Sequence, residues 1–384
     1  MSSQQNKKIY VGLSGGVDSS VAAALLQKDG HDVTGVYLKV WSPDLEDLMH
    51  GCPWEEDVRY AEATAKHLGI PFAVWDVSKE YFEHVVDYFI AEHRLGRTPN
   101  PDIMCNREIK FGIFLQRSRK EGADLIATGH YVRKHNAPQP PLNLRGGVPP
   151  LKIRGGEEGL WCAVDHNKDQ SYFLYSLTQN QLRYALFPVG DYSKPEVRKM
   201  AEEWGLPTAK RKDSQGICFL GKIPVKEFLK LRIPEHEGQL VTPSGKVVGK
   251  HEGTEFYTIG QRHGIGYKGG GTSYYVAGKN LEKNHVVVAE TNDAPELHRQ
   301  EIVVNDVRWI AGVAPVLPLT CMARIRYRQP LQAACITPSH SPLHKGEKEG
   351  VIVTFVKPQR AVTPGQACVL YQGDMMLGGG AIED

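Results

Sequence analysis

The chain reads Gly12-Leu13-Ser14-Gly15-Gly16-Val17-Asp18-Ser19-Ser20 between an apolar run, Ile9 to Leu13, and an amphipathic run, Val21 to Gln27. This order predicts a strand, a glycine-rich loop and a helix, with a phosphate site at the amino end of the helix. The adjacent glycines would let the backbone approach a phosphate, and the serines add hydroxyl donors. Because the loop lacks the lysine of a Walker A sequence, it is not indicated to hold a γ-phosphate for transfer. An ordinary serine- and glycine-rich turn is the alternative.

Length and composition limit the class of protein. At 384 residues the chain exceeds one typical core, so two or three domains are expected. The net charge is only +2, so nucleic-acid binding has to be judged from local patches. Neither an apolar signal core nor a run long enough to span a bilayer is visible, and we expect no membrane association. The seven cysteines include no CxxC pair, so we expect no metal site, no disulfide framework and a cytoplasmic protein.

The first half of the chain alternates between strand-like and helical patterns. Strand-like runs cover Val33 to Val40, Ile70 to Val77 and Asp124 to Thr128. Helical spacing of apolar residues covers Val58 to Leu68 and Lys79 to Arg94. This alternation predicts an α/β fold with a doubly wound, mostly parallel sheet. In such a sheet, ligands bind at the carboxyl ends of the strands.

Three residues are expected at those carboxyl ends. Leu38 lies near the end of the second strand-like run, and Gly129 and His130 follow the run that ends at Thr128. A glycine at this edge permits the close approach of a nucleotide. His130 would face the crevice, although a hydrogen-bonded loop histidine is the ordinary alternative.

A polar loop with two prolines, Gly96 to Asn106, holds the first cysteine of interest. The prolines are expected to prevent a helix here, and Asn106 to cap a helix that runs to about Glu121. Cys105 would then lie at a helix amino end, where a thiol pKa can fall to ~3.5–7.5. Asp102 is close enough to share the site. The alternative for Cys105 is a small buried apolar residue.

Two later stretches carry further polar candidates. Cys218 follows the basic run Lys210 to Lys212, and positive charge both lowers a thiol pKa and suits an RNA backbone. A buried cysteine behind a solvated turn is an equal alternative. Lys168 to Gln170 are expected at the polar mouth of an aromatic run, Tyr172 to Tyr175. Ser193 and Glu196 predict a capping box for the next helix.

After roughly Lys222 the helical pattern gives way to short strand-like runs. We therefore place an α/β domain at 1–222, a β-rich domain at 223–298 and a β-barrel at 299–384. Arg324, Arg326 and Arg328 alternate with apolar or aromatic residues, which predicts three guanidinium groups on one strand face. Unpaired cations on one face favour contact with RNA phosphates over a solvated edge strand.

Together these motifs resemble a known family. Residues Ser14 to Ser19 are similar to the pyrophosphate loop of ATP pyrophosphatases, which attack the α-phosphate. The whole chain resembles the tRNA-specific 2-thiouridylases, with the motifs of that family in the same order. The motifs are Ser14–Ser19, Asn100–Asn106, Gly129–Tyr131, Lys168–Leu174, Asp213–Phe219, Arg326–Gln329 and Thr363–Gln366.

The resemblance implies ATP-dependent 2-thiolation of the wobble uridine of tRNA, with AMP and pyrophosphate as products. ATP would adenylate the C2 oxygen of uracil. Cys218 would carry a persulfide supplied by a cysteine desulfurase or a sulfur-relay protein. Cys105 would attack that persulfide or assist its transfer, leaving a transient Cys105–Cys218 disulfide. Asp102 would act as acid/base or contact the target base.

The resemblance also implies binding residues. ATP, with Mg²⁺ held through its phosphates and not by a protein cage, would contact Gly12, Leu13, Ser14, Gly15, Gly16, Val17, Asp18, Ser19, Leu38 and Gly129. The target base or the tRNA would contact Asn100, Pro101, Asp102, His130, Lys168, Asp169, Gln170, Arg326, Tyr327, Arg328 and Gln366. We expect a monomer.

Two departures from the family pattern, at 138–150 and 339–350, lie outside the motifs. Two other functions remain possible from the residues. One is a pyrophosphate-loop amidase or ligase that acts on a small molecule, and the other is a noncatalytic tRNA-binding or sulfur-relay protein. The first leaves the two cysteines unexplained, and the second leaves the intact loop unexplained.

Overall fold

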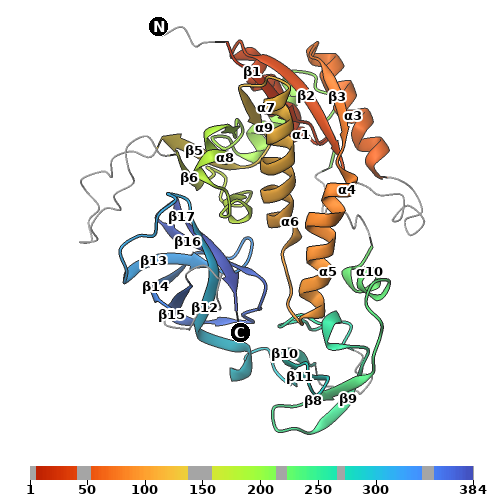
Figure 1. Cartoon of the computed structure of the whole chain (residues 1–384), viewed down its shortest axis with the longest axis vertical. Coiled ribbons are helices and arrows are strands. Elements are labelled where there is room, and N and C mark those ends of the chain that lie inside the picture. The colour runs from red at the N-terminus through yellow and green to blue at the C-terminus, as the bar shows by residue number, and fades with distance from the viewer. Residues whose placement is uncertain are drawn as a thin grey trace.

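The computed structural model describes residues 6–40, 53–136, 158–212, 223–265, 273–339 and 350–383. Its amino-terminal part is built on a parallel sheet (Figure 1). The strands lie in the order β3 (Phe72–Asp76), β2 (Asp32–Lys39), β1 (Lys8–Gly12), β4 (Leu125–Ala127) and β7 (Ala185–Leu186). The chain builds outward from β1 on one side and then returns to its other side with β4. The carboxyl ends of β1 and β4 therefore form the switch point at which ligands bind in such sheets.

Apolar residues cover both faces of this sheet, as expected for buried parallel strands. On one face, Ile9 and Val11 of β1 pack against α1 (Val17–Lys28) and α3 (Pro53–Leu68). On the other face, Tyr10 and Trp75 pack against Phe114. Helix α9 (Lys194–Glu203) packs along α1, and it begins with the predicted contact: the Ser193 N–H donates to Glu196 Oε2 at 2.7 Å.

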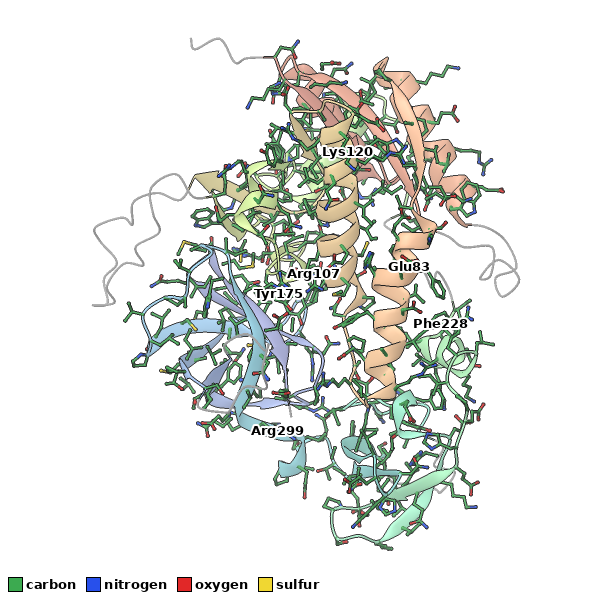
Figure 2. All side chains as sticks on the ribbon, in the orientation of Figure 1. Glu83, Arg107, Lys120, Tyr175, Phe228 and Arg299 are labelled. Atoms are coloured by element: carbon green, nitrogen blue, oxygen red, sulfur yellow. The ribbon has the colours of Figure 1, made fainter. Side chains whose placement is uncertain are left out.

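Two long helical runs extend from the sheet toward the rest of the molecule (Figure 1). The first comprises α4 (Ser78–Tyr81), a π-helical segment (Phe82–Val86) and α5 (Asp87–Arg94). The second comprises α6 (Pro101–Met104), a π-helical segment (Cys105–Phe114) and α7 (Leu115–Lys120). Side chains fill the space between the second run and the barrel, where Arg107 and Tyr175 are labelled (Figure 2). The Arg107 guanidinium acts to lower the pKa of Tyr175, although burial raises it overall.

The start of the second run differs from the sequence-based expectation. Asn106 was expected to cap this helix, but the cap is Asn100, whose Oδ1 accepts from the Asp102 N–H at 3.1 Å. Pro101 occupies the first helical position, where a proline loses no hydrogen bond and its φ already fits the helix. Cys105 consequently lies one turn inside the helix rather than at its amino end, and it is buried.

A small sheet forms the central part of the chain. Its order is β10 (Tyr275–Asn280), β11 (His285–Ala289), β8 (Gly238–Val241) and β9 (Val247–His251). Helix α10 (Val225–Lys230) packs its Phe228 against Phe89 of α5, with ring centres 6.3 Å apart. The central sheet is thereby attached to the far end of the first helical run.

The carboxyl-terminal part is a closed antiparallel barrel. Its strands follow the order β12 (His298–Trp309), β15 (Val351–Arg360), β14 (Gln332–Pro338), β13 (Leu319–Arg324), β16 (Ala367–Gln372) and β17 (Met375–Ile382), and β12 pairs with β17 to close it. A hairpin of β5 (Val132–Asn136) and β6 (Glu158–Cys162) adds to β17. The expected fold class, a parallel sheet followed by a β-rich domain and a barrel, is confirmed.

Short elements complete the connections. Helix α8 (Gln179–Arg183) has the capping box of Thr178 and Gln181. Single 3₁₀ turns cover Ser171–Phe173, Thr254–Phe256 and Pro295–Leu297. In the first of these, the Tyr172 hydroxyl donates to the Ala367 carbonyl at 3.0 Å, so the aromatic run joins the amino-terminal domain to the barrel.

Candidate active site

The glycine-rich loop lies at the switch point, and its own hydroxyls hold its shape. Gly16 precedes the first turn of α1, and its carbonyl accepts from Ser19 Oγ at 3.1 Å and from Ser20 Oγ at 2.9 Å. The Ser14 N–H donates to Ser19 Oγ at 3.2 Å. The first N–H groups of a helix have no partner within the helix, and the helix dipole adds partial positive charge there. The loop therefore presents the donors that a phosphate group needs.

An arginine from a distant segment supports the same loop. Arg211 Nη1 donates to the Gly15 carbonyl at 2.7 Å, and its Nη2 pairs with Asp57. Gly15 has φ +75°, and a side chain there would collide with the Asp57 carbonyl and Arg211. A glycine is required at this position for both reasons.

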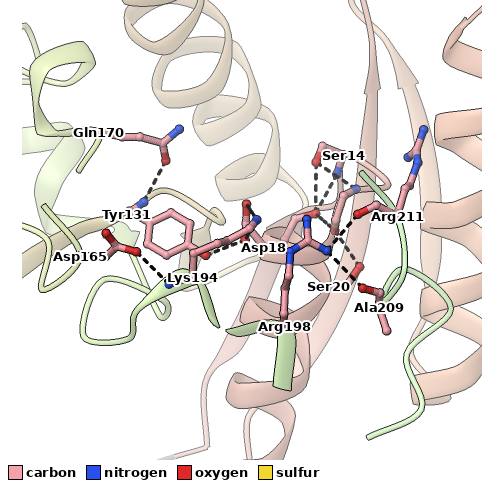
Figure 3. A network of polar contacts seen from close by, with 12 residues as sticks. Ser14, Asp18, Ser20, Tyr131, Asp165, Gln170, Lys194, Arg198, Ala209 and Arg211 are labelled. Carbon is pink, nitrogen blue, oxygen red and sulfur yellow. Dashed lines mark hydrogen bonds and ion pairs between the residues drawn. The ribbon is translucent and has the colours of Figure 1, made fainter. Parts of the chain in front are cut away.

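Asp18, expected at the ATP site, is held by two partners. Lys194 Nζ lies 2.7 and 2.8 Å from its carboxylate oxygens, and the Tyr131 hydroxyl donates to Oδ1 at 2.7 Å (Figure 3). The Lys194 side chain is 9% exposed and that of Asp18 is 31% exposed. Since Lys194 lies on α9 and Tyr131 follows β4, this contact fixes the first turn of α1 from two directions.

Gly129 was expected to make room for a nucleotide, and the structure shows a nearer reason for it. A Cβ at Gly129 would lie 2.6 Å from the Ser19 nitrogen, so the end of β4 packs directly on the first turn of α1. His130 follows and is buried, with its Nδ1 2.8 Å from Thr128 Oγ1. Burial lowers the pKa of His130 well below the usual value, so the ring is neutral at physiological pH.

Asp102 and Cys105 lie on the helical run that starts at Pro101. Burial raises the pKa of Asp102, while the Lys110 ammonium acts in the opposite direction. Lys110 also acts to lower the pKa of His130, which places both groups within reach of one cation. Asn106 is buried next to Cys105; its Nδ2 donates to the Phe173 carbonyl at 3.2 Å, and its Oδ1 has no protein partner among the described residues. A carboxyl group, a thiol and a free amide oxygen are thus gathered on one helix.

The expectation that residues 168–170 form a polar mouth is wrong for Asp169. Its side chain has no exposed surface, and it accepts from the Ala163 N–H at 3.1 Å and the Ser171 hydroxyl at 2.9 Å. Gln170 Oε1 accepts from the Tyr131 N–H at 3.0 Å. Asp169 therefore holds the end of β6 rather than offering a surface to RNA, while Lys168 and Gln170 are half-exposed.

The expected face of three arginines is also wrong, because strand β13 ends at Arg324. Arg324 is buried, and its Nη1 lies 3.2 Å from Asp169 Oδ2. Its guanidinium carbon lies 4.8 Å from the centre of the Tyr371 ring. Arg326 points to the Arg360 carbonyl at 2.9 Å, and Arg328 occupies a turn with φ +63°. A counterion far away in the sequence, with a turn that ends the alternation, explains the difference.

Gln366 reaches from the barrel to the segment that precedes α6. Its Nε2 donates to the Thr98 carbonyl at 2.7 Å, and the Thr98 N–H donates to the Pro364 carbonyl at 2.8 Å. Leu38, near the end of β2, is half-buried between the two helical runs and the sheet. Tyr327 packs on Phe173, with ring centres 4.6 Å apart. The residues expected to bind ATP and the target base therefore lie at one edge of the sheet and on the adjoining helix. Cys218 lies outside the described residues.

Comparisons with known proteins agree with this arrangement. A family model described as the tRNA methyl transferase HUP domain matches residues 7–222, which is more than half of the chain. The tRNA-specific 2-thiouridylase MnmA of Chromobacterium violaceum is 45% identical over 381 residues, covering 98% of this chain and 92% of that protein. The chain belongs to the tRNA-specific 2-thiouridylase family.

Other members of the 2-thiouridylase family match over the same length. The protein of that name from Francisella tularensis (strain SCHU S4) is 42% identical over 98% of this chain and 99% of its own. That of Pseudomonas paraeruginosa is 43% identical over 99% of this chain and 95% of its own. Two further family models match, the tRNA methyl transferase PRC-barrel domain at residues 226–290 and the aminomethyltransferase beta-barrel domain at 299–382.

A solved 4-thiouridine synthetase–RNA complex with bound ATP has 18% identity and a TM-score of 0.33, covering 59% of this chain and 50% of that one. In the described part of the chain, no helix has the length and apolar character needed to cross a membrane.

Sequence reasoning missed two residues at the loop of this 2-thiouridylase. Lys194 belongs to a motif that predicted only a helix cap, and no spacing connects it to Asp18. Arg211 was noticed as part of a basic run, but its charge was attributed to the thiol and to RNA. Its actual partners include the Gly15 carbonyl and Asp57, and a sequence pattern does not encode these contacts.

Proposed function

We propose that this protein catalyses the ATP-dependent 2-thiolation of the wobble uridine of tRNA, releasing AMP and pyrophosphate. Family membership carries the proposal, because relatives that match nearly the whole chain are named tRNA-specific 2-thiouridylases. It makes the protein a sulfurtransferase that modifies tRNA. The phosphate loop at the switch point supports the use of ATP.

In the first step, the C2 oxygen of uracil forms a bond to the α-phosphorus of ATP, and the bond to pyrophosphate breaks. The reaction turns a poor leaving group into an AMP ester. Gly12 to Ser19 would bind the phosphates through the amino end of α1, while Leu38 and Gly129 flank the nucleotide. Arg211 and Lys194 keep the loop in shape by holding Gly15 and Asp18.

Mg²⁺ is expected to arrive with the ATP phosphates. Among the described residues there is no group of three or more histidine, cysteine or carboxylate side chains that could hold an ion. The carboxylate within the glycine-rich stretch, that of Asp18, is bound to Lys194. These residues do not form a protein cage for a divalent ion, and no step is assigned to one.

In the second step, sulfur replaces the activated oxygen. A persulfide on Cys218, loaded by a cysteine desulfurase or a sulfur-relay protein, is attacked by the Cys105 thiolate. The Cys105–Cys218 disulfide forms and hydrosulfide leaves, adds to C2 and expels AMP. A reductant must then restore both thiols before the next cycle.

Asp102 is the acid/base group of this scheme. Because its pKa is raised, the Asp102 carboxyl stays protonated to a higher pH than that of an exposed aspartate, which suits proton exchange with the uracil ring. Asn100 and Pro101 form the helix start beside it and would shape the pocket of the extruded base. Contacts to tRNA are assigned to His130, Lys168, Arg326, Tyr327, Arg328 and Gln366. Half-exposed Gln170 is assigned a contact to tRNA like Lys168, whereas for the buried Asp169 any effect on tRNA is expected through the position of β6.

A reconstituted assay with ATP, tRNA and a persulfide donor tests the proposal. Pyrophosphate release should require tRNA, and nucleoside mass spectrometry should detect 2-thiouridine. Cys218→Ser should still release pyrophosphate but produce no thiolated nucleoside, whereas Cys335→Ser on the barrel serves as the matched control and should behave as wild type. Pyrophosphate release that needs only a small amine or acid would instead indicate a ligase, and no release at all would indicate a noncatalytic protein.

A further inference from the structure

Two arginines from different domains stack on one tyrosine where the central sheet meets the barrel. Tyr275 is the first residue of β10, and the guanidinium carbons of Arg262 and Arg360 lie 6.0 and 5.5 Å from its ring centre. Arg262 is exposed on the loop before β10, and Arg360 ends β15 of the barrel. Stacking on an aromatic ring orients each guanidinium plane. Arg262 Nη2 also donates to Ser273 Oγ at 3.1 Å and Arg360 Nε to the Asn292 carbonyl at 3.2 Å, so it is the remaining N–H groups that can bind a ligand.

A third cation lies beside this stack. Arg326 Nη2 donates to the Arg360 carbonyl at 2.9 Å and also to the Ala361 carbonyl. Burial and the positive charge of Arg360 lower the pKa of Arg326. In the described segments, no carboxylate forms an ion pair with Arg262, Arg326 or Arg360, whereas Arg211 pairs with Asp57 and Arg324 with Asp169. Cations gathered without a counterion raise the free energy of the empty surface and attract an anion.

The joint between the two domains is close-packed, so these side chains are held in place. A Cβ at Gly260 would lie 2.6 Å from the Ala361 Cβ, and the Gly260 N–H donates to the Val276 carbonyl at 2.7 Å. The same loop reaches the active-site helix, since Thr258 Oγ1 lies 3.2 Å from Thr98 Oγ1, just ahead of Asn100. The basic surface is therefore connected directly to the segment that starts the Asp102 helix.

We propose that Arg262, Tyr275, Arg326 and Arg360, here called the arginine joint, bind backbone phosphates of the tRNA arm whose nucleotide enters the site at Asp102. This inference rests on the proposed function for the identity of the RNA. A guanidinium fork matches the geometry of a phosphate group, and the tyrosine edge allows a neighbouring base or ribose to pack. Because the cations come from two domains, binding at this surface requires the joint in its present geometry.

The salt dependence of tRNA binding tests the arginine joint. Each phosphate contact contributes about 0.7 to 0.9 to the slope of log K against log salt, so Arg262→Gln with Arg360→Gln should reduce the slope by about 1.4 to 1.8. Affinity near 0.1 M salt should fall by about tenfold. Arg183→Gln, at the opposite end of the parallel sheet, is the matched control and should keep the wild-type slope.

Two further variants separate charge from structure. Tyr275→Leu should weaken tRNA binding and keep most of the slope, because the charges remain, and melting temperatures will identify any variant that is unfolded. Arg360→Lys should restore most of the slope without restoring full affinity. A double variant that folds and keeps the wild-type slope would overturn the proposal. If the double variant reduces the salt slope of tRNA binding as expected but the wild-type protein makes no 2-thiouridine, the proposed function fails while the arginine joint stands.

Discussion

Replacement of Gly129 by alanine tests whether the end of β4 sets the geometry of the phosphate loop. The new Cβ would lie 2.6 Å from the Ser19 nitrogen, 2.7 Å from the Asp18 carbonyl carbon and 3.0 Å from the Ser19 Cα. All three atoms are backbone atoms of the first turn of α1, so no side-chain rotation can relieve the contact. Either β4 or α1 must move.

The size of the movement follows from these distances. Ordinary van der Waals contact begins at 3.4 Å, so the two backbones have to separate by about 0.8 Å. Overpacking of this kind costs about 1–3 kcal/mol, offset in part by the ~0.4–1 kcal/mol that an alanine removes from the freedom of the unfolded chain. Displacement of catalytic groups by about 1 Å can reduce a rate by about 100-fold. We therefore expect a modest loss of stability and a much larger loss of function.

Isothermal titration with ATP and tRNA-dependent pyrophosphate release measure the effect on function, and urea unfolding measures the effect on stability. Gly278→Ala is the matched control, because the nearest atom to its Cβ, in Val287, would be 3.7 Å away and its conformation suits an alanine. Gly129→Ala should bind ATP about 10 to 100 times more weakly than wild type. If it binds ATP and releases pyrophosphate as wild type does, the argument that β4 positions the loop is refuted.

Four other predictions follow from buried or half-buried groups. Arg324→Met should lower the free energy of unfolding by about 3–5 kcal/mol, because it leaves Asp169 buried without its cation, and urea unfolding with Asp169→Asn added should recover part of the loss. Gln366→Leu removes a hydrogen bond worth about 0.5–1.5 kcal/mol, so the melting temperature should fall only slightly. Single-turnover thiolation should nevertheless become clearly slower, because the loop before the Asp102 helix loses this contact. Burial lowers the pKa of His93 to about 4 from 6.5, so on acidification the unfolded chain binds the proton before the folded one does. The free energy of unfolding should therefore decline as pH falls from 6.5 toward 4. His93→Gln should flatten that decline in urea titrations at several pH values. Burial raises the pKa of Asp102, so the folded state loses stability as pH rises above 3.8, and Asp102→Asn should be more resistant to urea at neutral pH while thiolation, followed by mass spectrometry, is lost.

Local patterns predicted the parts of the structure that depend on neighbouring residues. The strand, loop and helix around Gly15 appear where the apolar run, the glycine-rich stretch and the amphipathic run predicted them. The contact between Ser193 and Glu196 is present because a capping box involves residues only three apart. The barrel was predictable in kind, because short strand-like runs without helical spacing can bury their apolar faces only against other strands.

The failures come from contacts that sequence spacing does not contain. The alternation around Arg324 looked like a strand with one charged face, but Asp169 supplies a buried counterion from the amino-terminal domain. The two prolines before Cys105 were read as helix breakers, whereas Pro101 is the first residue of the helix. In both cases, the sequence singled out the right residue, but it did not show the buried partner of Arg324 or the position of Pro101 in the helix.

Both β-rich domains contact the segment that precedes α6, the helix on which the proposed reacting groups Asp102 and Cys105 lie. The Gly96 carbonyl accepts from Lys279 Nζ of the central sheet at 2.8 Å, and Thr98 contacts Thr258 of the same domain at 3.2 Å. From the barrel, Gln366 bonds the Thr98 carbonyl at 2.7 Å. The helix with Asp102 and Cys105 therefore begins from a loop that all three domains hold. We therefore expect a tRNA contact that shifts the central sheet against the barrel to shift this loop as well, and with it the start of the helix that carries Asp102 and Cys105.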